Sequence, residues 1–254
     1  MSGKEIRLKK LYHHSDKLLI VPMDHGITIG PVTGLTEINQ TVNAVFDGGA
    51  DAVVVHKGLV RYLTDALGSN KGELIIHLSA STALAPESQS MRKELVSSVE
   101  HSIRLGATAI STHVNLGSQF EAEQIKDVGL IAEECDKWGM PLLAMMYVRD
   151  GSKAHEFDPE RIRHAARVAE ELGADIVKVN YSGTPETFRQ VVSGVKIPVL
   201  IAGGERLGSN DDLLTMIDDA VSAGANGISI GRNIFQDENP EKLCANIRSI
   251  LNQS

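Results

Sequence analysis

The sequence predicts an α/β fold in which eight parallel strands, each followed by a helix, close into a single (β/α)8 barrel over residues 1–254. Eight short apolar runs alternate with longer segments of helical periodicity, and 254/8 gives about 32 residues per unit, the size of a β-α repeat. Most runs are continuously apolar, as in strands covered on both faces. About 250 residues is also the usual length of a TIM barrel. An open, doubly wound sheet is the alternative, although no G-x-G-x-x-G motif follows the first run.

The eight apolar runs give the expected strands, at 19–23, 52–56, 74–78, 109–114, 142–147, 175–179, 197–202 and 227–231. Apolar residues at helical spacing give the expected helices, at 36–48, 91–105, 119–138, 159–172, 184–193, 210–223 and 239–252. Glycine ends most of these helices, because it adopts the left-handed conformation that lets the chain turn back. The segment after the second strand, 57–72, is less regular, and we expect a short helix or a loop there.

Composition excludes several classes of protein. With 42% apolar and 23% charged residues, the chain can build a core and is not disordered. The formal net charge is −8 and no basic run is present, so we expect no binding to nucleic acid or to an anionic membrane. No apolar stretch approaches the roughly 18–20 residues of a membrane span, and we expect no signal peptide. Cys135 and Cys244 lie far apart in expected helices, which predicts free thiols and a cytoplasmic location.

Chemically active side chains gather where the expected strands end, which is where barrels of this type place their active sites. Nearly every strand end carries a polar or ionisable residue or a glycine. In chain order these are Asp24 and His25, His56 and Lys57, His77, His113, Tyr147 and Arg149, Lys178 and Asn180, Gly203 and Gly204, and Gly231 and Arg232. A barrel with a purely structural role would not need this clustering.

Lys178 is the most informative of these residues, because it interrupts an apolar strand. Strand alternation places Ile176, Lys178 and Asn180 on one face, and Val177 and Val179 on the other. Lysine is rarely buried without a reason. If Lys178 points into the barrel, its amine can act as a nucleophile toward carbonyls and form a Schiff base.

Other interpretations of the lysines stay open. Lys178 could reach solvent at the end of its strand, or form a buried ion pair with Asp24. Lys57 is the rival candidate for an imine, and it could instead bind an anionic group or be solvated next to Gly58. Tyr147, on the same face as Met145, could move protons beside an imine or be a tyrosine at the barrel rim. Asp24 could accept a proton, hold a hydroxyl group or cap a turn.

The last two strands indicate a phosphate site. Gly203 and Gly204 follow the seventh strand, and Gly231 and Arg232 follow the eighth. Barrels often bind phosphate with these two loops, because glycines let backbone N–H groups approach the anion and an arginine adds charge.

A metal site is the competing interpretation. Four histidines end the first four strands and could together bind a divalent metal: His25, His56, His77 and His113.

Seven segments together resemble the archaeal-type class I aldolase family: VPMDHG at 21–26, HKG at 56–58, STHVN at 111–115, WGMPLLAMMY at 138–147, ADIVKVNYSG at 174–183, AGG at 202–204 and GRNIFQ at 231–236. The resemblance extends over about residues 7–250. Within the family the chain looks most like the synthases that make aminoheptulosonates. The segments around Asp24, Tyr147 and Lys178 are specific, whereas AGG and GRN occur in many phosphate-binding barrels.

The resemblance implies that Lys178 forms the Schiff base, that Tyr147 donates a proton, and that Asp24 binds substrate and acts as acid or base. Together with the strand-end positions, it gives a set of expected substrate-binding residues: His25, Gly26, Ile27, Thr28, Lys57, His113, Val148 and Arg149. The expected phosphate-binding residues are Gly203, Gly204, Gly231 and Arg232. We expect no metal and no other cofactor, since the imine forms on the protein itself.

The resemblance also implies a reaction. A phosphorylated ketone, either dihydroxyacetone phosphate or 6-deoxy-5-ketofructose 1-phosphate, would be joined to L-aspartate 4-semialdehyde. The product would lead to an aminohydroxybenzoate or to 3-dehydroquinate. Relatives assemble as homo-oligomers, some of them decamers, so we expect a homo-oligomer by analogy. Substrate choice is expected to vary through the loops 26–31 and 150–157.

Three other functions fit the residues less well. The same imine chemistry could cleave fructose 1,6-bisphosphate. A metal-dependent barrel enzyme, a hydrolase or a class II-like aldolase, could use the histidines at the rim. A non-catalytic barrel could sense a sugar phosphate, because a fold by itself does not decide function.

Overall fold

A computed structural model describes residues 2–253, and in it eight parallel strands close into a barrel. The strands are β1 (Leu18–Pro22), β2 (Ala52–Val55), β3 (Glu73–His77), β6 (Ala109–Leu116), β7 (Leu142–Val148), β8 (Ile176–Asn180), β9 (Val199–Ala202) and β10 (Gly227–Ser229). Around the barrel their order is β1-β10-β9-β8-β7-β6-β3-β2, with every pairing parallel. The predicted fold class is confirmed.

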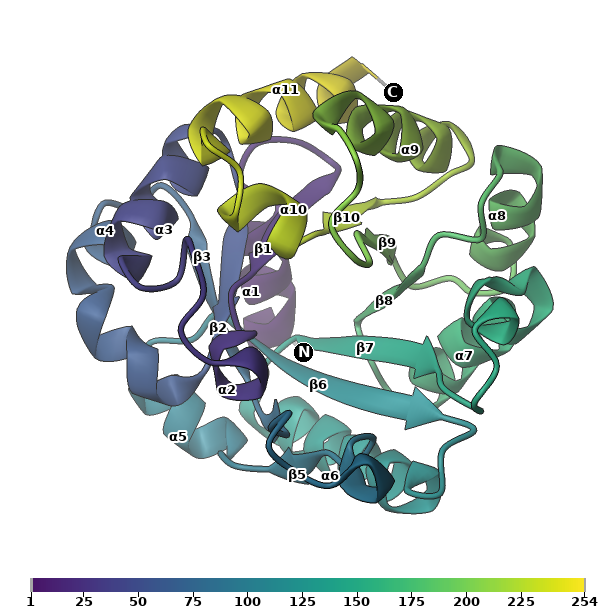
Figure 1. The fold of residues 1–254 in the computed structure, drawn as a ribbon. Helices are drawn as coiled ribbons and strands as arrows, with labels where there is room; N and C mark the ends of the chain where they lie inside the picture. The colour runs from purple at the N-terminus through teal and green to yellow at the C-terminus, as the bar shows by residue number, and fades with distance from the viewer. Residues whose placement is uncertain (1, 254) are drawn as a thin grey trace.

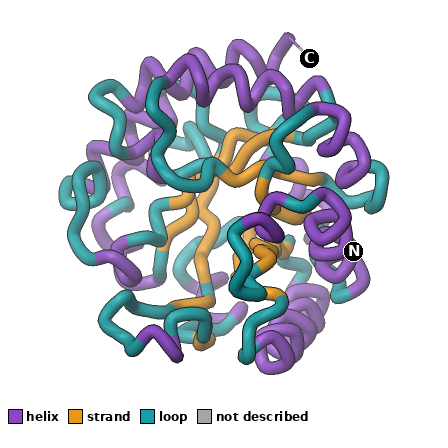
Figure 2. Tube along the Cα trace, turned by 45° about the vertical axis from the view of Figure 1, so that its right-hand side comes forward, coloured by secondary structure: helices purple, strands orange, loops and turns teal. Residues whose placement is uncertain are grey.

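Helices surround the strands, as Figure 1 shows. In Figure 2 the strands, coloured orange, lie at the centre of the molecule. The ring contains α3 (Ile38–Asp47), α4 (Thr64–Gly68), α5 (Val99–Arg104), α6 (Glu121–Trp138), α7 (Pro159–Glu171), α8 (Pro185–Val192), α9 (Asn210–Ser222) and α11 (Pro240–Gln253). Shorter elements are α2 (Gly26–Ile29), α10 (Arg232–Phe235), the 3-10 helices η1 (Lys57–Tyr62), η2 (Glu87–Gln89) and η3 (Ala154–Phe157), and the strand pair β4 (Ser79–Ala80) and β5 (Glu94–Leu95).

Local sequence explains where several helices begin. Asp158 and Thr184 cap α7 and α8 by accepting hydrogen bonds from the first turn, and a proline follows each of them. Ser209 caps α9 in the same way. Gly139 ends α6 with a left-handed φ of 62°, a conformation that glycine adopts without strain. The expected helices therefore form close to their predicted bounds, with one exception at 91–105.

Two layers of apolar side chains hold the barrel together. One layer lies between the strands and the surrounding helices, and the other fills the barrel interior. The interior layer comprises Leu18, Ile20, Ala52, Val54, Ile75, Ala109, Leu143, Met145, Ile176 and Leu200, with Leu11 from outside the strands. A filled interior is typical of this fold, so substrate can bind only at the ends of the strands.

A helix that the sequence analysis did not predict, α1 (Ser2–Leu11), closes the amino end of the barrel. Leu11 packs into the interior, and Arg7 donates a hydrogen bond to the Gly139 carbonyl at 2.8 Å. Lys4 lies 3.3 Å from the Asp175 carboxylate, just before β8. Helix α1 thus covers the end of the barrel opposite the carboxyl ends of the strands.

The segment 91–105 differs from the prediction. Helix α5 begins only after Ser98, whose side chain accepts a hydrogen bond from the His101 backbone N–H. The preceding residues form a loop that contains β5, paired antiparallel with β4 after the end of β3. This arrangement brings Lys93, on that loop, to the end of the barrel where the carboxyl ends of the strands meet.

Candidate active site

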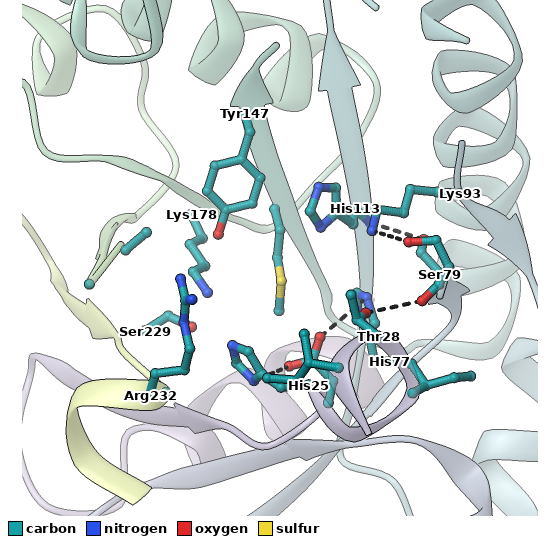
Figure 3. Close-up of a pocket in the computed structure, with 18 of the residues that line it drawn as sticks. His25, Thr28, His77, Ser79, Lys93, His113, Tyr147, Lys178, Ser229 and Arg232 are labelled. Carbon is teal, nitrogen blue, oxygen red and sulfur yellow. Dashed lines mark hydrogen bonds and ion pairs between the residues drawn. The ribbon is translucent and has the colours of Figure 1, made fainter. Parts of the chain in front are cut away.

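A cavity of about 280 Å³ opens at the carboxyl ends of the strands (Figure 3). All eight barrel strands supply residues to it from their ends or from the loops that follow. These include Asp24, His56, His77, His113, Tyr147, Lys178, Gly203 and Gly231. The strand-end residues selected from the sequence thus meet at one place.

Lys178 points into the barrel, as strand alternation predicts. The side chain is 6% exposed, and its amine lines the cavity. Ile176 on the same face belongs to the barrel interior, whereas Val177 and Val179 pack toward the helices. Lys178 is in register with Met145 on β7, which in turn is in register with His113 on β6. The backbone ladder therefore fixes the depth of this amine in the cavity.

Tyr147 stands two residues after Met145 on β7 and faces the same cavity. In Figure 3 its hydroxyl points toward Lys178. The ring lies 4.9 Å from that of His113, and the Arg149 guanidinium lies 5.2 Å from the ring centroid. Glu156 holds Arg149 in place through an ion pair. These contacts fix the orientation of the phenol.

Asp24 faces the lysine from the end of β1. Burial alone would raise the pKa of Asp24, but at the low pH where this carboxylate would take up a proton, His77 and His25 are themselves protonated, and with Lys178 they hold that pKa well below its usual value. Asp24 Oδ2 lies 3.7 Å from His77 Nε2, and Oδ1 is buried without a hydrogen-bond partner. Oδ1 lies 3.6 Å from His25 Nδ1, beyond hydrogen-bonding distance, so it can still accept a hydrogen bond from a ligand.

The histidines around the cavity are kept neutral by burial. Burial lowers the pKa of His77 to about 3, and that of His113 falls well below its usual value. It also lowers the pKa of His25 and of His56. Between residues 2 and 253, no three histidine, cysteine or carboxylate side chains are grouped so as to hold a metal ion. The competing interpretation of the four strand-end histidines as a metal site is therefore not supported by a cluster of ligands in the described part of the chain.

The opposite side of the cavity is lined by glycines. A Cβ atom on Gly231 would come within 2.5 Å of the Pro22 carbonyl oxygen, and one on Gly203 within 2.6 Å of Ile230, so close packing requires glycine at both positions, whereas Gly204 has no atom within 4 Å of its Cβ position. Arg232 donates a hydrogen bond to the Gly204 carbonyl at 2.8 Å, while its Nε is buried without a partner. Ser229, also facing the cavity, has a buried hydroxyl without a partner. These groups can together receive a phosphate.

Comparison with known proteins identifies the family. Residues 18–237 match the DeoC/LacD family of aldolases. The chain belongs to this family. It is 44% identical over 251 residues to 2-amino-3,7-dideoxy-D-threo-hept-6-ulosonate synthase 1 of Archaeoglobus fulgidus, covering 99% of this chain and 92% of that protein. It is 41% identical over 253 residues to 2-amino-4,5-dihydroxy-6-oxo-7-(phosphonooxy)heptanoate synthase of Streptomyces griseus, covering 99% and 91%.

Solved structures of other aldolases have the same fold as this chain. An archaeal fructose 1,6-bisphosphate aldolase matches with a TM-score of 0.88 at 29% identity, over 99% of this chain and 100% of that one. Another such structure, with a TM-score of 0.86 at 29% identity over 98% and 99%, has its catalytic lysine covalently bound to the carbinolamine intermediate of the substrate. The prediction of an imine-forming class I aldolase is confirmed.

Most of the predicted site residues of the aldolase line the cavity, but three do not. Gly26 begins α2 without reaching the lining. Lys57 is exposed, and its ammonium donates to the Val96 carbonyl. Val148 lines a separate cavity between α6 and α7, because adjacent residues of a strand face opposite sides and Tyr147 faces inward. Direct substrate contacts from these three residues are not supported by their positions.

Sequence reasoning missed several residues of the lining: Ser79, Ser81, Lys93 and Ser229. The most significant is Lys93, which the predicted helix 91–105 placed on the barrel surface. The pair Ser97-Ser98 was the available signal, since serine is a preferred helix N-cap and would have moved the start of the helix past Lys93.

In the described part of the chain, no helix is long and apolar enough to cross a membrane.

Proposed function

We propose that the protein is a class I aldolase-type synthase that joins a phosphorylated ketone to L-aspartate 4-semialdehyde. The observation that carries the proposal is the buried Lys178 amine, which faces a cavity shared with Tyr147 and Asp24. The names of the Streptomyces and Archaeoglobus relatives support an aminoheptulosonate product. The donor is dihydroxyacetone phosphate or 6-deoxy-5-ketofructose 1-phosphate.

The reaction begins when the Lys178 amine adds to the donor ketone and water leaves, which forms a protonated imine. The imine withdraws electrons from the adjacent carbon. That carbon then loses a proton, which gives an enamine. In the longer donor the enamine forms instead by retro-aldol cleavage, in which the β-hydroxyl gives up its proton and the departing carbons leave as an aldehyde. The enamine carbon attacks the acceptor aldehyde, whose oxygen takes up a proton. Water hydrolyses the new imine and regenerates the lysine.

Tyr147 and Asp24 supply the proton transfers. The phenol of Tyr147 points toward the amine and can donate to the departing hydroxyl or to the new alkoxide. Asp24 is ionised, so it can accept a proton or hold a substrate hydroxyl. Positioned groups of this kind contribute roughly 10²- to 10⁴-fold each to the rate.

Phosphate binding by Gly203, Gly204, Gly231 and Arg232 would anchor the donor away from the reacting carbons. The binding energy of a remote group positions the reacting centre and lowers the entropic barrier. With dihydroxyacetone phosphate as donor, the product is a seven-carbon acid. Its phosphate and carboxylate lie at opposite ends, and its ketone lies next to the carbon that bears the phosphate.

Borohydride trapping followed by peptide mapping tests the proposal. The protein is incubated with each donor, reduced and digested, and a stable adduct is expected on the peptide that contains Lys178. Lys178→Met should abolish the adduct and the turnover while the protein stays folded, and Lys57→Met should retain both. Labelling of Lys57 would keep the mechanism and refute the residue assignment. Turnover retained by Lys178→Met would refute both.

Cleavage of fructose 1,6-bisphosphate is the second candidate, favoured by the structural match to archaeal aldolases of that substrate. A direct assay separates the two. Rapid release of triose phosphate from fructose 1,6-bisphosphate, with no consumption of aspartate semialdehyde, would favour the second candidate. Condensation with aspartate semialdehyde would favour the first.

The expected homo-oligomer, cytoplasmic location and absence of a metal remain predictions. Light scattering of the purified protein measures its oligomeric state. Activity measured after dialysis against EDTA is expected to be unchanged, and loss of activity restored by zinc would contradict the metal-free mechanism.

A further inference from the structure

Lys93 is a second lysine at the active-site cavity, and the mechanism above does not use it. It lies on the loop that β5 forms beyond the end of β3, half-buried, and its ammonium donates a hydrogen bond to the Ser81 hydroxyl at 2.6 Å. Among the side chains that the structure describes, no ion pair joins Lys93 to a carboxylate. Burial lowers the pKa of Lys93, although the more distant charge of Asp24 acts in the opposite direction. A desolvated cation without a paired carboxylate is costly unless a ligand supplies the charge.

Lys93 and Arg232 lie on opposite sides of the cavity (Figure 3). Arg232 follows β10, and Lys93 contacts Ser81 just beyond β3 and β4. In the barrel order, β9 and β10 are separated from β3 and β6 by two or more strands in either direction. The cavity thus has a cationic group at each end, with Lys178 on β8 between them.

The surroundings of Lys93 leave hydrogen-bonding capacity for a ligand. Both ring nitrogens of His56 are buried and have no hydrogen-bond partner, and His56 lines the same cavity. The nearby ring of His77 stands 5.4 Å from that of His56 and already bonds to the Ser111 hydroxyl at 2.7 Å. Burial holds these imidazoles neutral, and Arg149, whose charge also acts on Lys93, is paired with Glu156. Lys93 is therefore a cation on this side of the cavity that has no carboxylate partner among the described side chains.

We propose that Lys93 binds the carboxylate of the acceptor aldehyde, with His56 as a neutral hydrogen-bonding neighbour. This inference rests on the proposed function and adds to it the residue that selects an acidic acceptor. Dihydroxyacetone phosphate as donor gives a seven-carbon product. Its ketone carbon, which was bonded to Lys178, lies one carbon from the phosphate-bearing carbon and five carbons from the carboxylate carbon. Lys178 is correspondingly on the strand next to β9, whereas Lys93 is on the far side.

A carboxylate suits Lys93 better than a second phosphate. The ammonium stands with a serine hydroxyl and neutral imidazoles, which match a single negative charge. The Arg232 side instead combines a guanidinium with the backbone of Gly203, Gly204 and Gly231, a combination suited to a dianion. The two ends of the cavity therefore differ in chemistry as well as in position.

Steady-state kinetics of Lys93→Met test this assignment. With a saturating amount of the donor that labels Lys178, the KM for L-aspartate 4-semialdehyde should rise about 10- to 100-fold, as expected for the loss of one charged hydrogen bond. Condensation with propanal, which has no charge, should stay within about 3-fold of the wild type, as should imine trapping on Lys178. Lys93→Arg should retain most of the affinity, and Lys126→Met, an exposed lysine on α6, should change nothing.

Several outcomes would overturn the assignment. An unchanged KM for aspartate semialdehyde, or equal losses with propanal and with aspartate semialdehyde, would show that Lys93 does not bind the carboxylate. A selective loss with glyceraldehyde 3-phosphate as acceptor would assign the subsite to phosphate instead. If wild-type protein traps no imine on Lys178, the proposed function itself fails and the assignment falls with it. Thermal unfolding of each variant, with Lys93→Gln as a second substitution, separates these results from misfolding.

Discussion

Lys178 and Tyr147 lie on adjacent strands of the barrel, and the residue two before Tyr147, Met145, is in register with Lys178. Strand alternation turns both side chains to the interior, so the phenol stands one step beyond the amine toward the mouth of the cavity. A lysine and a tyrosine separated by 30 residues of sequence thereby become neighbours. Their relative position depends on backbone pairing rather than on flexible loops, which favours proton transfer with defined geometry.

Tyr147→Phe should separate imine formation from proton transfer. The substitution keeps the ring that packs against His113 and removes only the hydroxyl. We expect turnover to fall roughly 10²- to 10⁴-fold, the usual contribution of a positioned acid or base, while borohydride still traps donor on Lys178. Single-turnover trapping and steady-state rates measured side by side check this. Full activity in the variant would mean that another group moves the proton.

Arg232→Met should weaken the binding of a phosphorylated donor and leave the binding of an uncharged donor nearly unchanged. Arg232 lines the cavity beside Gly203 and Gly231, and its Nε is buried without a partner. The concentration of dihydroxyacetone phosphate that gives half-maximal imine trapping should rise about 10- to 100-fold, the cost of one charged contact. Trapping of unphosphorylated dihydroxyacetone is the matched control and should hardly change. Equal losses with both ketones would argue against a phosphate contact.

Stability should decrease as the pH falls below about 6.5, because the buried histidines resist protonation. An unfolded histidine takes up a proton near pH 6.5, whereas burial lowers the pKa of folded His77 to about 3. Between these values the unfolded state binds more protons, so the free energy of unfolding drops by about 1.4 kcal/mol per pH unit for each such group. Urea unfolding from pH 7 to pH 5 measures the slope.

His77→Asn should make that slope shallower by about one proton, since the titrating group is gone. His164→Gln is the control, because His164 is exposed on α7. A slope in His77→Asn equal to that of the wild type would show that His77 titrates normally in the folded protein.

The ion pair between Asp51 and Arg248 should be the most sensitive electrostatic contact outside the active site. Asp51 is fully buried and also accepts hydrogen bonds from the backbone N–H groups of His14 and Leu19, at 3.0 and 2.7 Å. Arg248→Met leaves this carboxylate without its guanidinium partner, although the His14 ring, with Nδ1 3.0 Å from Oδ1, stays beside it, and the free energy of unfolding should fall by about 3–5 kcal/mol. Chemical denaturation checks the value.

The control for that experiment is Arg163→Met, which removes an exposed pairing with Glu160 at 3.8 Å and should cost less than about 1 kcal/mol. A double variant that combines Arg248→Met with Asp51→Asn should be less destabilised than the sum of the two single changes, because the uncompensated charge is removed. Additive losses would show that the two groups do not interact.

Much of the site could be predicted because a parallel barrel brings every strand end to one mouth. Once the apolar runs are recognised as strands, Asp24, Tyr147, Lys178 and Gly203 must share that mouth, however distant they are in sequence. The alternation of Ile176, Lys178 and Asn180 also predicted the inward direction of the lysine. Strand alternation should also have been applied to Val148, which we expected to bind substrate. Val148 follows the inward-facing Tyr147 and therefore faces the helices.

The amino-acid sequence by itself determined the order of strands and helices, the inward face of β8 and the chemistry offered at the strand ends, because periodicity and caps act over a few residues. Only the tertiary structure decided that α1 closes the amino end and that the loop before α5 carries Lys93 to the cavity. The hydrogen bond between Lys93 and Ser81, like the β4–β5 pairing, joins segments whose proximity no local pattern encodes. Such contacts depend on how the whole barrel packs. The position of Lys93 at the cavity therefore could not be predicted from local sequence patterns.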